Sequence, residues 1–309
     1  MTIRVVVIVG PTATGKTRLG VEVAHALGSQ IISADSRQVY RGLDLGTGKD
    51  LDEYSAVDPP VPYHLIDIAD PQEVYTLFRY QQDCYEVLRS FAEKPAFSSG
   101  SVPLLMVGGS GLYVEAVIKA YRIADVPEDP ELRRSLEPEP TDVLVDRLCD
   151  TDPTLAQRTD LASRRRVVRA LEIAAAASRG PVETSETPGV EIDWKVYAVD
   201  LDREVVRRRI RSRLEQRLGN GLIDEVRGLL AAGLSPGRLD DLGLEYREIG
   251  AFLAKRKDRR RMVDDLATGI GRFAKRQSTW FRGMERRGTT ITWIAPDDAS
   301  RILQDVEQW

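Results

Sequence analysis

The residues best suited to chemistry form one octapeptide, Gly10-Pro11-Thr12-Ala13-Thr14-Gly15-Lys16-Thr17. It has the form G-x-x-x-x-G-K-[ST] and stands between an apolar run and a segment with apolar residues at four-residue spacing, the strand–loop–helix setting of a phosphate-binding loop. Glycines let successive N–H groups turn inward around an anion, and the helix N-terminus adds positive charge. The alternative interpretation of this octapeptide is a glycine-rich turn that matches the motif by chance. We expect a di- or triphosphate, as in nucleotide-binding and ATP-binding proteins, to contact Gly10, Thr12, Ala13, Thr14, Gly15, Lys16 and Thr17.

Three further polar residues follow predicted strands. Asp35 could position Mg²⁺ or water, or act as a general base, although a helix N-cap is the simpler role for it. Asp67 resembles the carboxylate that supports Mg²⁺ in other P-loop proteins, with a structural turn as the competing interpretation, while the Thr17 hydroxyl can hold the ion directly. Ser110 lies in the turn Gly108-Gly109-Ser110-Gly111, where its hydroxyl can donate to phosphate or merely shape the turn.

Basic residues gather in three clusters although the net charge of the chain is −4. Two lie on predicted helices over residues 203–218 and 163–177, and the third, over residues 275–282, has aromatic residues interleaved. A charge run is most often a solvated helix face. Three such clusters in an acidic chain nevertheless favour an anionic partner such as phosphate or RNA, and basic residues beside aromatics suit splayed RNA bases. The clusters contain Arg203, Arg207, Arg208, Arg209, Arg211, Arg213 and Arg217; Arg164, Arg165, Arg166 and Arg169; and Lys275, Arg276, Trp280 and Arg282.

The elements that must position these residues alternate between strand-like and helical patterns. This alternation predicts the α/β class, with a P-loop parallel sheet flanked by helices, and it places Asp35, Asp67 and Ser110 on the same rim as Lys16. The alternation of strands and helices stops over residues 120–195. This change predicts a mostly helical insertion domain between the two parts of the core, 1–119 and 196–309. Strands are predicted over residues 3–9, 30–36, 63–68, 103–107, 196–200 and 289–294, and further helices over 74–91 and 260–286.

Composition narrows the class of protein. The chain has 309 residues, of which 42% are hydrophobic and 30% charged, values typical of a folded globular protein. The two cysteines are far apart and no apolar run reaches the length of a membrane span. Because the chain has only two histidines, we do not expect a His-based metal site or a Ser/His triad. We therefore expect a cytoplasmic protein that does not associate with membranes and acts as a monomer.

Together the motifs resemble the tRNA dimethylallyltransferase (isopentenyltransferase) family. The matching stretches occur in family order and span most of the chain, and the second and last are far more specific than the P-loop. They are GPTATGKT at 10–17, ISADSRQVYRGLDLGTGK at 32–49, YHLIDI at 63–68, GGSGLY at 108–113, RRRVVRALEI at 164–173, RIRSRLEQRLGNGLIDEV at 209–226 and KRQSTWFR at 275–282.

The resemblance implies a prenyl transfer with Mg²⁺ as cofactor. The dimethylallyl group of dimethylallyl diphosphate would pass to N6 of adenosine 37 in tRNA, releasing diphosphate. By family position, Asp35 would accept the N6 proton, and Lys16, Ser110 and Arg213 would complete the catalytic set. The residues that would meet tRNA are Asp35, Ser36, Arg37, Gln38, Ser110, Arg133, Arg165, Arg166, Arg169, Lys275, Arg276, Gln277, Trp280 and Arg282.

The sequence departs from the family pattern at four positions. Ser110 replaces a threonine but keeps the hydroxyl, and Arg165 stands where a glutamine is common. Arg217 occupies a position that is often methionine, which can alter helix packing. Glu245 precedes Tyr246 where the family more often has glycine, which bears on the local RNA contact.

Three other functions fit parts of the sequence. An adenylate isopentenyltransferase acting on free AMP would not need the insertion or the KRQSTWFR stretch. A P-loop small-molecule kinase would use ATP at the same loop. A non-catalytic RNA-binding protein would retain its function after Asp35→Ala.

Overall fold

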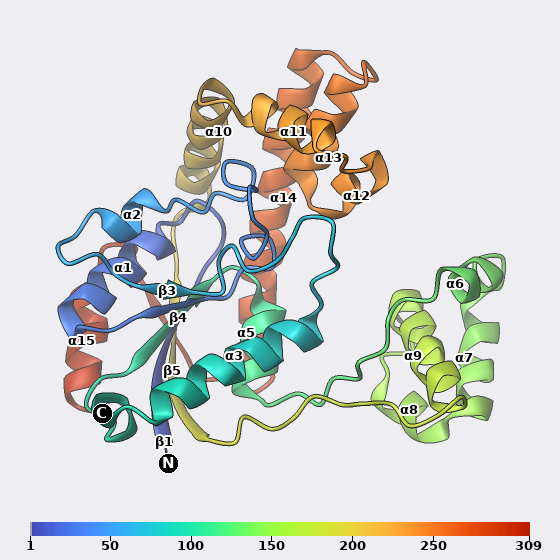
Figure 1. The fold of residues 1–309 in the computed structure, drawn as a ribbon, viewed down its shortest axis with the longest axis horizontal. Coiled ribbons are helices and arrows are strands. Elements are labelled where there is room, and N and C mark those ends of the chain that lie inside the picture. Colours follow the sequence, from blue (N-terminus) through green and yellow to red (C-terminus); the bar gives the residue numbers. More distant parts are fainter. Residues whose placement is uncertain (1) are drawn as a thin grey trace. The chain divides into compact units, whose positions relative to one another are not determined.

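The structure is a computed structural model that describes residues 2–309 (Figure 1). The chain divides into two compact units. The core unit contains the residues up to Ala120 together with Pro188–Trp309, and the inserted unit is Tyr121–Thr187.

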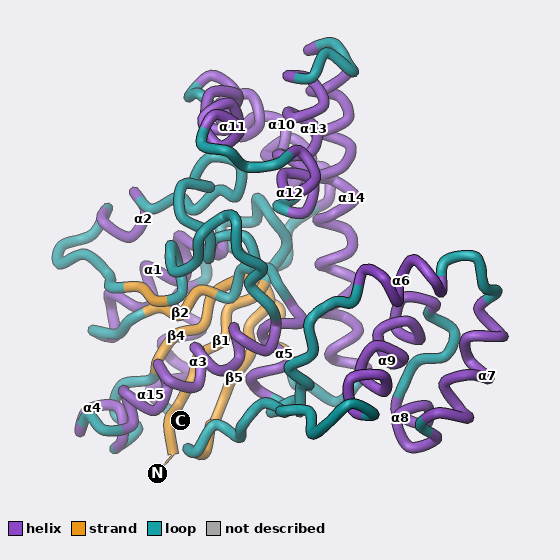
Figure 2. The backbone as a smooth tube through the Cα atoms, turned by 45° about the vertical axis from the view of Figure 1, so that its right-hand side comes forward, coloured by secondary structure: helices purple, strands orange, loops and turns teal. Residues whose placement is uncertain are grey.

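A parallel sheet forms the centre of the core unit (orange in Figure 2). Within residues 2–309 it has six strands in the order β3-β2-β4-β1-β5-β6, and every neighbouring pair is parallel. The strand that precedes the P-loop is therefore central, and the strands that precede Asp35 and Ser110 are direct neighbours. The strands are β1 (Thr2–Val9), β2 (Ile31–Ser33), β3 (Tyr63–His64), β4 (Leu104–Gly108), β5 (Glu191–Val199) and β6 (Ile291–Ile294).

Helices cover both faces of this sheet, which confirms the predicted α/β class. Those near the sheet are α1 (Lys16–Leu27), α3 (Leu77–Ala92), α5 (Gly111–Ile118) and α15 (Ala299–Glu307), and the short α2 (Asp52–Ser55) and α4 (Pro95–Ser98) lie in connections. The later helices are α10 (Arg203–Gly219), α11 (Leu222–Ala231), α12 (Pro236–Asp241), α13 (Leu244–Leu253) and α14 (Arg259–Arg286).

Strand β1 shows why the sheet is buried on both faces. Val5, Val7 and Val9 pack into the cluster on the side of α3 and α5, whereas Val6 and Ile8 pack into the cluster on the side of α1 and α15. A strand buried on both sides has no polar face, so its sequence is a continuous apolar run.

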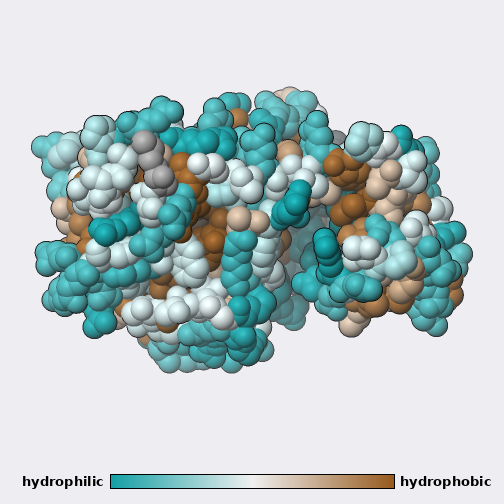
Figure 3. All heavy atoms as spheres, turned by 90° about the horizontal axis from the view of Figure 1, so that it is seen from below, coloured by the Kyte–Doolittle hydropathy of each residue, from teal (hydrophilic) through white to brown (hydrophobic). Residues whose placement is uncertain are grey.

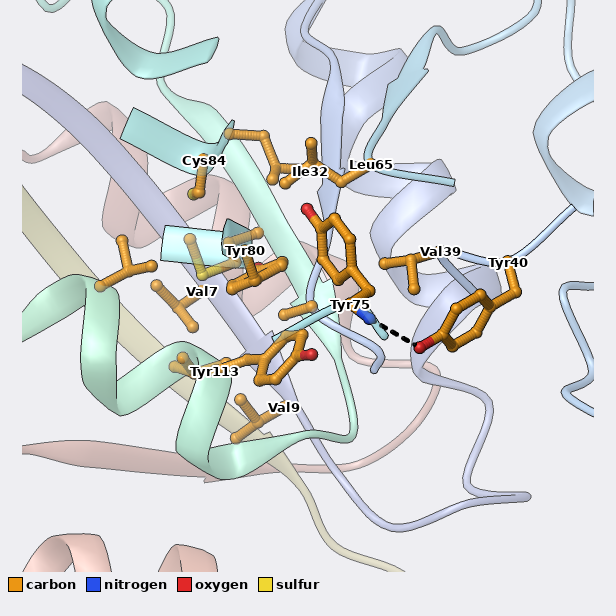
Figure 4. Packing of buried hydrophobic residues seen from close by; sticks show 14 of the residues in the cluster. Val7, Val9, Ile32, Val39, Tyr40, Leu65, Tyr75, Tyr80, Cys84 and Tyr113 are labelled. Carbon is orange, nitrogen blue, oxygen red and sulfur yellow. Dashed lines mark hydrogen bonds between the residues drawn. The ribbon is translucent and has the colours of Figure 1, made fainter. Parts of the chain in front are cut away.

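The cluster beside α3 also supports the site end of the sheet. Figure 4 shows Tyr80 and Tyr113 among the aliphatic side chains, with ring centroids 4.0 Å apart. The Tyr80 hydroxyl donates to the carbonyl of Ser33, the last residue of β2, at 3.1 Å. This bond fixes the strand end immediately before Asp35.

Several predicted strands differ from the observed ones at their ends, and two of them differ most. The strand predicted over residues 63–68 ends at His64, because Leu65 and Asp67 adopt left-handed backbone angles with φ of 62° and 57°. Such angles cannot continue a strand. Asp67 therefore lies in a loop and does not close a strand, contrary to the prediction. In the other case β5 begins at Glu191, before the predicted start at Val196.

The inserted unit has a core of its own. Its helices are α6 (Pro130–Leu136), α7 (Thr141–Thr151), α8 (Pro153–Arg158) and α9 (Arg164–Ala177). Leu136, Leu144, Leu148 and Val167 form a buried cluster that these helices share. The predicted helix over residues 163–177 is thus observed, with Ser163 as its N-cap.

The surface in Figure 3 is largely hydrophilic, with hydrophobic side chains reaching it in patches. Among residues 2–309, no helix is both long enough and apolar enough to cross a membrane.

Candidate active site

The P-loop connects β1 to α1 through an anion-binding turn. Ala13 and Gly15 have left-handed φ values of 64° and 95°, and the Thr14 hydroxyl donates to the Pro11 carbonyl at 2.8 Å. Left-handed residues curl the chain so that successive N–H groups can face one anion, and α1 begins directly at Lys16. The Thr17 hydroxyl is half-buried in the first turn and makes no hydrogen bond with residues 2–309.

Two side chains from distant helices hold this loop. Gln277 of α14 accepts a hydrogen bond from the Thr12 N–H and donates one to the Gly109 carbonyl, both at 2.9 Å. Arg209 of α10 donates to the Thr14 carbonyl at 3.2 Å. Gln277 is only 6% exposed, so its contacts fit a residue that positions the P-loop against the glycine turn.

Gln277→Leu should lower the free energy of unfolding by about 1–3 kcal/mol, because the Thr12 N–H and the Gly109 carbonyl lose their partner in a buried place. Urea denaturation of the full-length protein measures the change. Gln304→Leu, at an exposed position on α15, serves as the control and should be nearly neutral. Equal midpoints for the two variants would contradict the assigned role of Gln277.

Asp35 is held beside the glycine turn by the neighbouring strands. Its Oδ1 accepts the Arg37 N–H at 3.0 Å, and the carboxyl group is half-buried. The Ser110 hydroxyl accepts the Ser36 N–H at 3.0 Å and lies 3.3 Å from the Ser36 hydroxyl. The hydrogen bonds of Ser110 therefore tie the Asp35 loop to the end of β4.

The rest of the Asp35 loop is fixed by side chains. Gln38 accepts from the Ser33 hydroxyl at 3.1 Å and donates to the Gly48 carbonyl at 3.2 Å. Arg37 is exposed and donates to the Asp241 carbonyl at 2.6 Å. Gln38 thus connects the end of β2 to the loop that contains Gly48.

The Lys16 ammonium group is buried among charged side chains. Burial lowers the pKa of the Lys16 ammonium, whereas the Asp35 charge raises it and the Arg213 charge lowers it further. Lys16 makes no ion pair within residues 2–309. A cation without a partner in a phosphate-binding loop is suited to receive an anionic ligand.

Helix α10 presents arginines to the P-loop along one stripe. Arg209, Arg213 and Arg217 are four residues apart, so their side chains lie on the same helix face. Arg213 pairs with Asp50 through a short contact, and Arg217 and Asp50 are 3.8 Å apart. Arg213 and Arg217 line a cavity together with Thr12, Ala13, Ile210, Leu214, Leu222, Glu245 and Ile270.

Comparison with known proteins places this chain in a family. The model of the family described as IPP transferase matches residues 38–284, and the model described as isopentenyl transferase matches residues 3–56. The chain belongs to the tRNA dimethylallyltransferase family. A relative named tRNA dimethylallyltransferase 1, from Syntrophus aciditrophicus (strain SB), is 48% identical over 303 residues, which cover 98% of this chain and 97% of the relative.

Solved structures agree with this assignment. The full-length tRNA isopentenylpyrophosphate transferase from Bacillus halodurans superposes with a TM-score of 0.68 at 30% identity, and the match covers 99% of this chain and 97% of that one. A eukaryotic dimethylallyltransferase acting on tRNA shares the fold, with a TM-score of 0.71 at 20% identity and coverage of 99% and 77%.

Lys49 is a buried residue of this family member that the sequence analysis did not single out. Its side chain is 1% exposed. The ammonium group donates to the Tyr40 carbonyl at 2.8 Å and to Asp44 at 2.6 Å, and it also contacts Asp67 through a short ion pair. Of the two roles left open for Asp67, the structural one is favoured by these contacts. Its carboxylate neutralises a buried lysine, a requirement that only the tertiary structure reveals.

The residues of the 275–282 segment point in different directions. Lys275, Arg276 and Arg282 are exposed, whereas Trp280 is half-buried and Gln277 is buried. The sequence pattern predicted a helix with basic residues. It could not show which of these residues are exposed, or that Gln277 is buried and holds the P-loop.

Several arginines of the inserted unit are engaged within that unit. Arg133 and Arg169 both contact Glu172, at 2.7 and 3.1 Å, and Arg166 pairs with Asp160 at 2.6 Å. Burial raises the pKa of Glu172, but hydrogen bonds from Arg133, the Asp129 amide and Arg169 outweigh it, so the pKa is lowered.

The two remaining arginines of this cluster, Arg164 and Arg165, differ in whether they are engaged within the inserted unit. Arg164 donates to the carbonyls of Leu136, Glu137 and Glu139 at 2.7, 3.0 and 2.6 Å, and so caps the end of α6. Arg165 is exposed.

Proposed function

We propose that this enzyme transfers the dimethylallyl group from dimethylallyl diphosphate to N6 of adenosine 37 in tRNA and releases diphosphate. The observation that carries the proposal is the convergence of the P-loop, Asp35 and Arg213 on one rim of the sheet in a chain of this family. As a family member, the chain is a prenyltransferase.

The P-loop would hold the diphosphate, which is the leaving group. As the bond between the prenyl carbon and the diphosphate oxygen breaks, negative charge grows on the diphosphate and positive charge on the allylic carbon. The inward N–H groups, Lys16 and Arg213 would stabilise the growing negative charge. Arg213 would exchange its contact with Asp50 for the diphosphate.

Asp35 would take the proton from the attacking nitrogen. The N6 lone pair forms the new bond to carbon while the carbon–oxygen bond breaks, and the N6 proton passes to the Asp35 carboxylate. Ser110, through its bonds to Ser36, would keep that loop in place and meet the nucleotide. The adenine must leave its stack to reach this position.

The oxygen donors near the P-loop fit Mg²⁺. Within residues 2–309 the Thr17 hydroxyl has no hydrogen-bond partner, and no cluster of three or more His, Cys, Asp or Glu side chains is arranged there to hold a metal alone. Mg²⁺ is commonly bound by few protein oxygens together with phosphates and water. Thr17 would therefore hold Mg²⁺, which would neutralise diphosphate charge when bound.

The remaining predicted contacts would serve the RNA. Exposed Lys275, Arg276 and Arg282 offer charge for tRNA phosphates, and Trp280 offers a partly accessible ring. Arg37 and Ser36, next to Asp35 in the chain, would lie beside the base. In the inserted unit, exposed Arg165 is the clearest candidate for a tRNA contact. Gln277 and Gln38 would support the tRNA indirectly, because both are used to position loops. We propose that the enzyme acts in the cytoplasm as a monomer.

A prenylation assay tests this function. The purified full-length protein with labelled dimethylallyl diphosphate and Mg²⁺ should label unmodified tRNA that carries adenosine 37, and should not label AMP. An adenylate isopentenyltransferase would label AMP, and a kinase would instead consume ATP. Absence of label in tRNA would overturn the proposal.

A further inference from the structure

Arg217 is a largely buried arginine that lines the cavity beside the P-loop. Its side chain is 17% exposed and lines the same cavity as Thr12, Ala13 and Arg213. The neighbouring loop leaves room for it at Gly48, where φ is 64° and a Cβ atom would overlap the guanidinium group. A larger residue at position 48 would displace the arginine, so the local backbone accommodates Arg217 where it is.

The charge of Arg217 is only loosely compensated. Its closest carboxylate is Asp50 at 3.8 Å, which also pairs with Arg213, and Arg217 makes no hydrogen bond within the described part of the chain. Burial lowers the pKa of Arg217, and the Arg213 charge acts in the same direction, while Asp50 and Glu245 oppose them. A guanidinium group has five N–H donors, and a largely buried one normally finds acceptors for them.

Glu245 faces the same cavity from the start of α13. Burial raises the pKa of its carboxyl group above the usual value, although its own backbone N–H and the charges of Arg217 and Arg37 act to lower it. A carboxylate next to an anion-binding loop would repel the ligand unless a cation stands between them. Arg217 and Glu245 are also two of the positions where the sequence departs from the family pattern.

We propose that Arg217 is a second diphosphate-binding arginine, next to Arg213, and that its charge offsets that of the Glu245 carboxyl group, which lines the same cavity. The proposal rests on the proposed function. The three arginines of this helix face would then have different roles. Arg209 contacts the P-loop backbone, and Arg213 and Arg217 would bind the leaving group. Arg217 would supply charge-assisted hydrogen bonds that the P-loop and Lys16 do not provide.

Binding of inorganic diphosphate, measured by calorimetry on the full-length protein with Mg²⁺, tests this role. Arg217→Met should weaken binding about 10- to 100-fold, the range expected for losing hydrogen bonds to a charged group. Arg217→Lys should recover part of the loss. Arg211→Met, on the same helix but 64% exposed, is the matched control and should bind as the unmodified protein does.

A substitution at Glu245 provides a second test, again by the affinity for inorganic diphosphate. Without Arg217, an ionised Glu245 carboxylate should repel diphosphate. At a pH above the raised pKa of Glu245, Glu245→Gln added to Arg217→Met should therefore tighten binding relative to the single variant. A purely structural arginine would instead lower thermal stability without this recovery. If Arg217→Met does not fold, Arg217→Gln is measured against the same expectation.

Two results would overturn the proposal: diphosphate binding unchanged in Arg217→Met or Arg217→Gln, or no recovery on adding Glu245→Gln at a pH where the Glu245 carboxyl group is ionised. Failure of the unmodified protein to prenylate tRNA would overturn the proposed function instead. Diphosphate binding needs no prenyl acceptor, so the two failures are distinguishable.

Discussion

Asp35→Asn should lower the rate constant of prenyl transfer about 10²- to 10⁴-fold, the usual contribution of a general base. Asparagine keeps an Oδ1 acceptor for the Arg37 N–H, so the loop geometry is retained while the group that takes the N6 proton is lost. Single-turnover transfer from labelled dimethylallyl diphosphate to tRNA measures the step.

A matched control exists at Asp70. This exposed residue accepts the Gln72 N–H at 2.8 Å in the same local arrangement, and Asp70→Asn should transfer at the unmodified rate. Asp35→Asn should still bind inorganic diphosphate normally. A variant that prenylates tRNA at the full rate would show that Asp35 is not the base.

The phosphate-binding end of the site was predictable because its residues are close together in sequence. The G-x-x-x-x-G-K-[ST] spacing specifies the turn, and the alternation of strands and helices predicts a parallel sheet whose carboxyl ends share one rim. The adjacency of β2 and β4 was not specified by this rule. It is the feature that joins Ser36 to Ser110 across 74 residues.

Other parts depend on partners that sequence patterns do not identify. Glu225 accepts N–H bonds from Asp44, Leu45 and Gly46 at 3.1, 2.6 and 3.0 Å. Such a pairing joins segments about 180 residues apart, and any of many carboxylates could have made it. The strand predicted to end near Asp67 was wrong for a different reason. Leu65 and Asp67 adopt left-handed backbone angles, and the Asp67 carboxylate pairs with the buried Lys49.

Charge clusters were the least informative pattern. A run of arginines indicates positive charge but not which members are already paired. In the inserted unit Glu172 engages Arg133 and Arg169, while Arg165 is exposed. On α10, four-residue spacing places Arg209, Arg213 and Arg217 on one face and Arg203, Arg207 and Arg211 on another, but only the structure shows that the first set faces the P-loop.

Lys16→Met should lower the rate constant of transfer about 10²- to 10³-fold, the loss typical when one preorganised donor to a developing anion is removed. Methionine keeps an unbranched side chain of similar length, so the start of α1 should form normally. Affinity for inorganic diphosphate should fall as well, because Lys16 is the P-loop cation that makes no ion pair within residues 2–309.

The control for Lys16 is Arg18→Met, which removes one positive charge from an exposed position in the same helix turn. If net charge near the loop were the main effect, both variants would lose diphosphate affinity to the same extent. We expect only Lys16→Met to do so, because the ammonium must contact the phosphate oxygens to stabilise their growing charge in the transition state. Equal losses would assign the effect to the long-range field, and the P-loop lysine would then have no special role in expelling the leaving group.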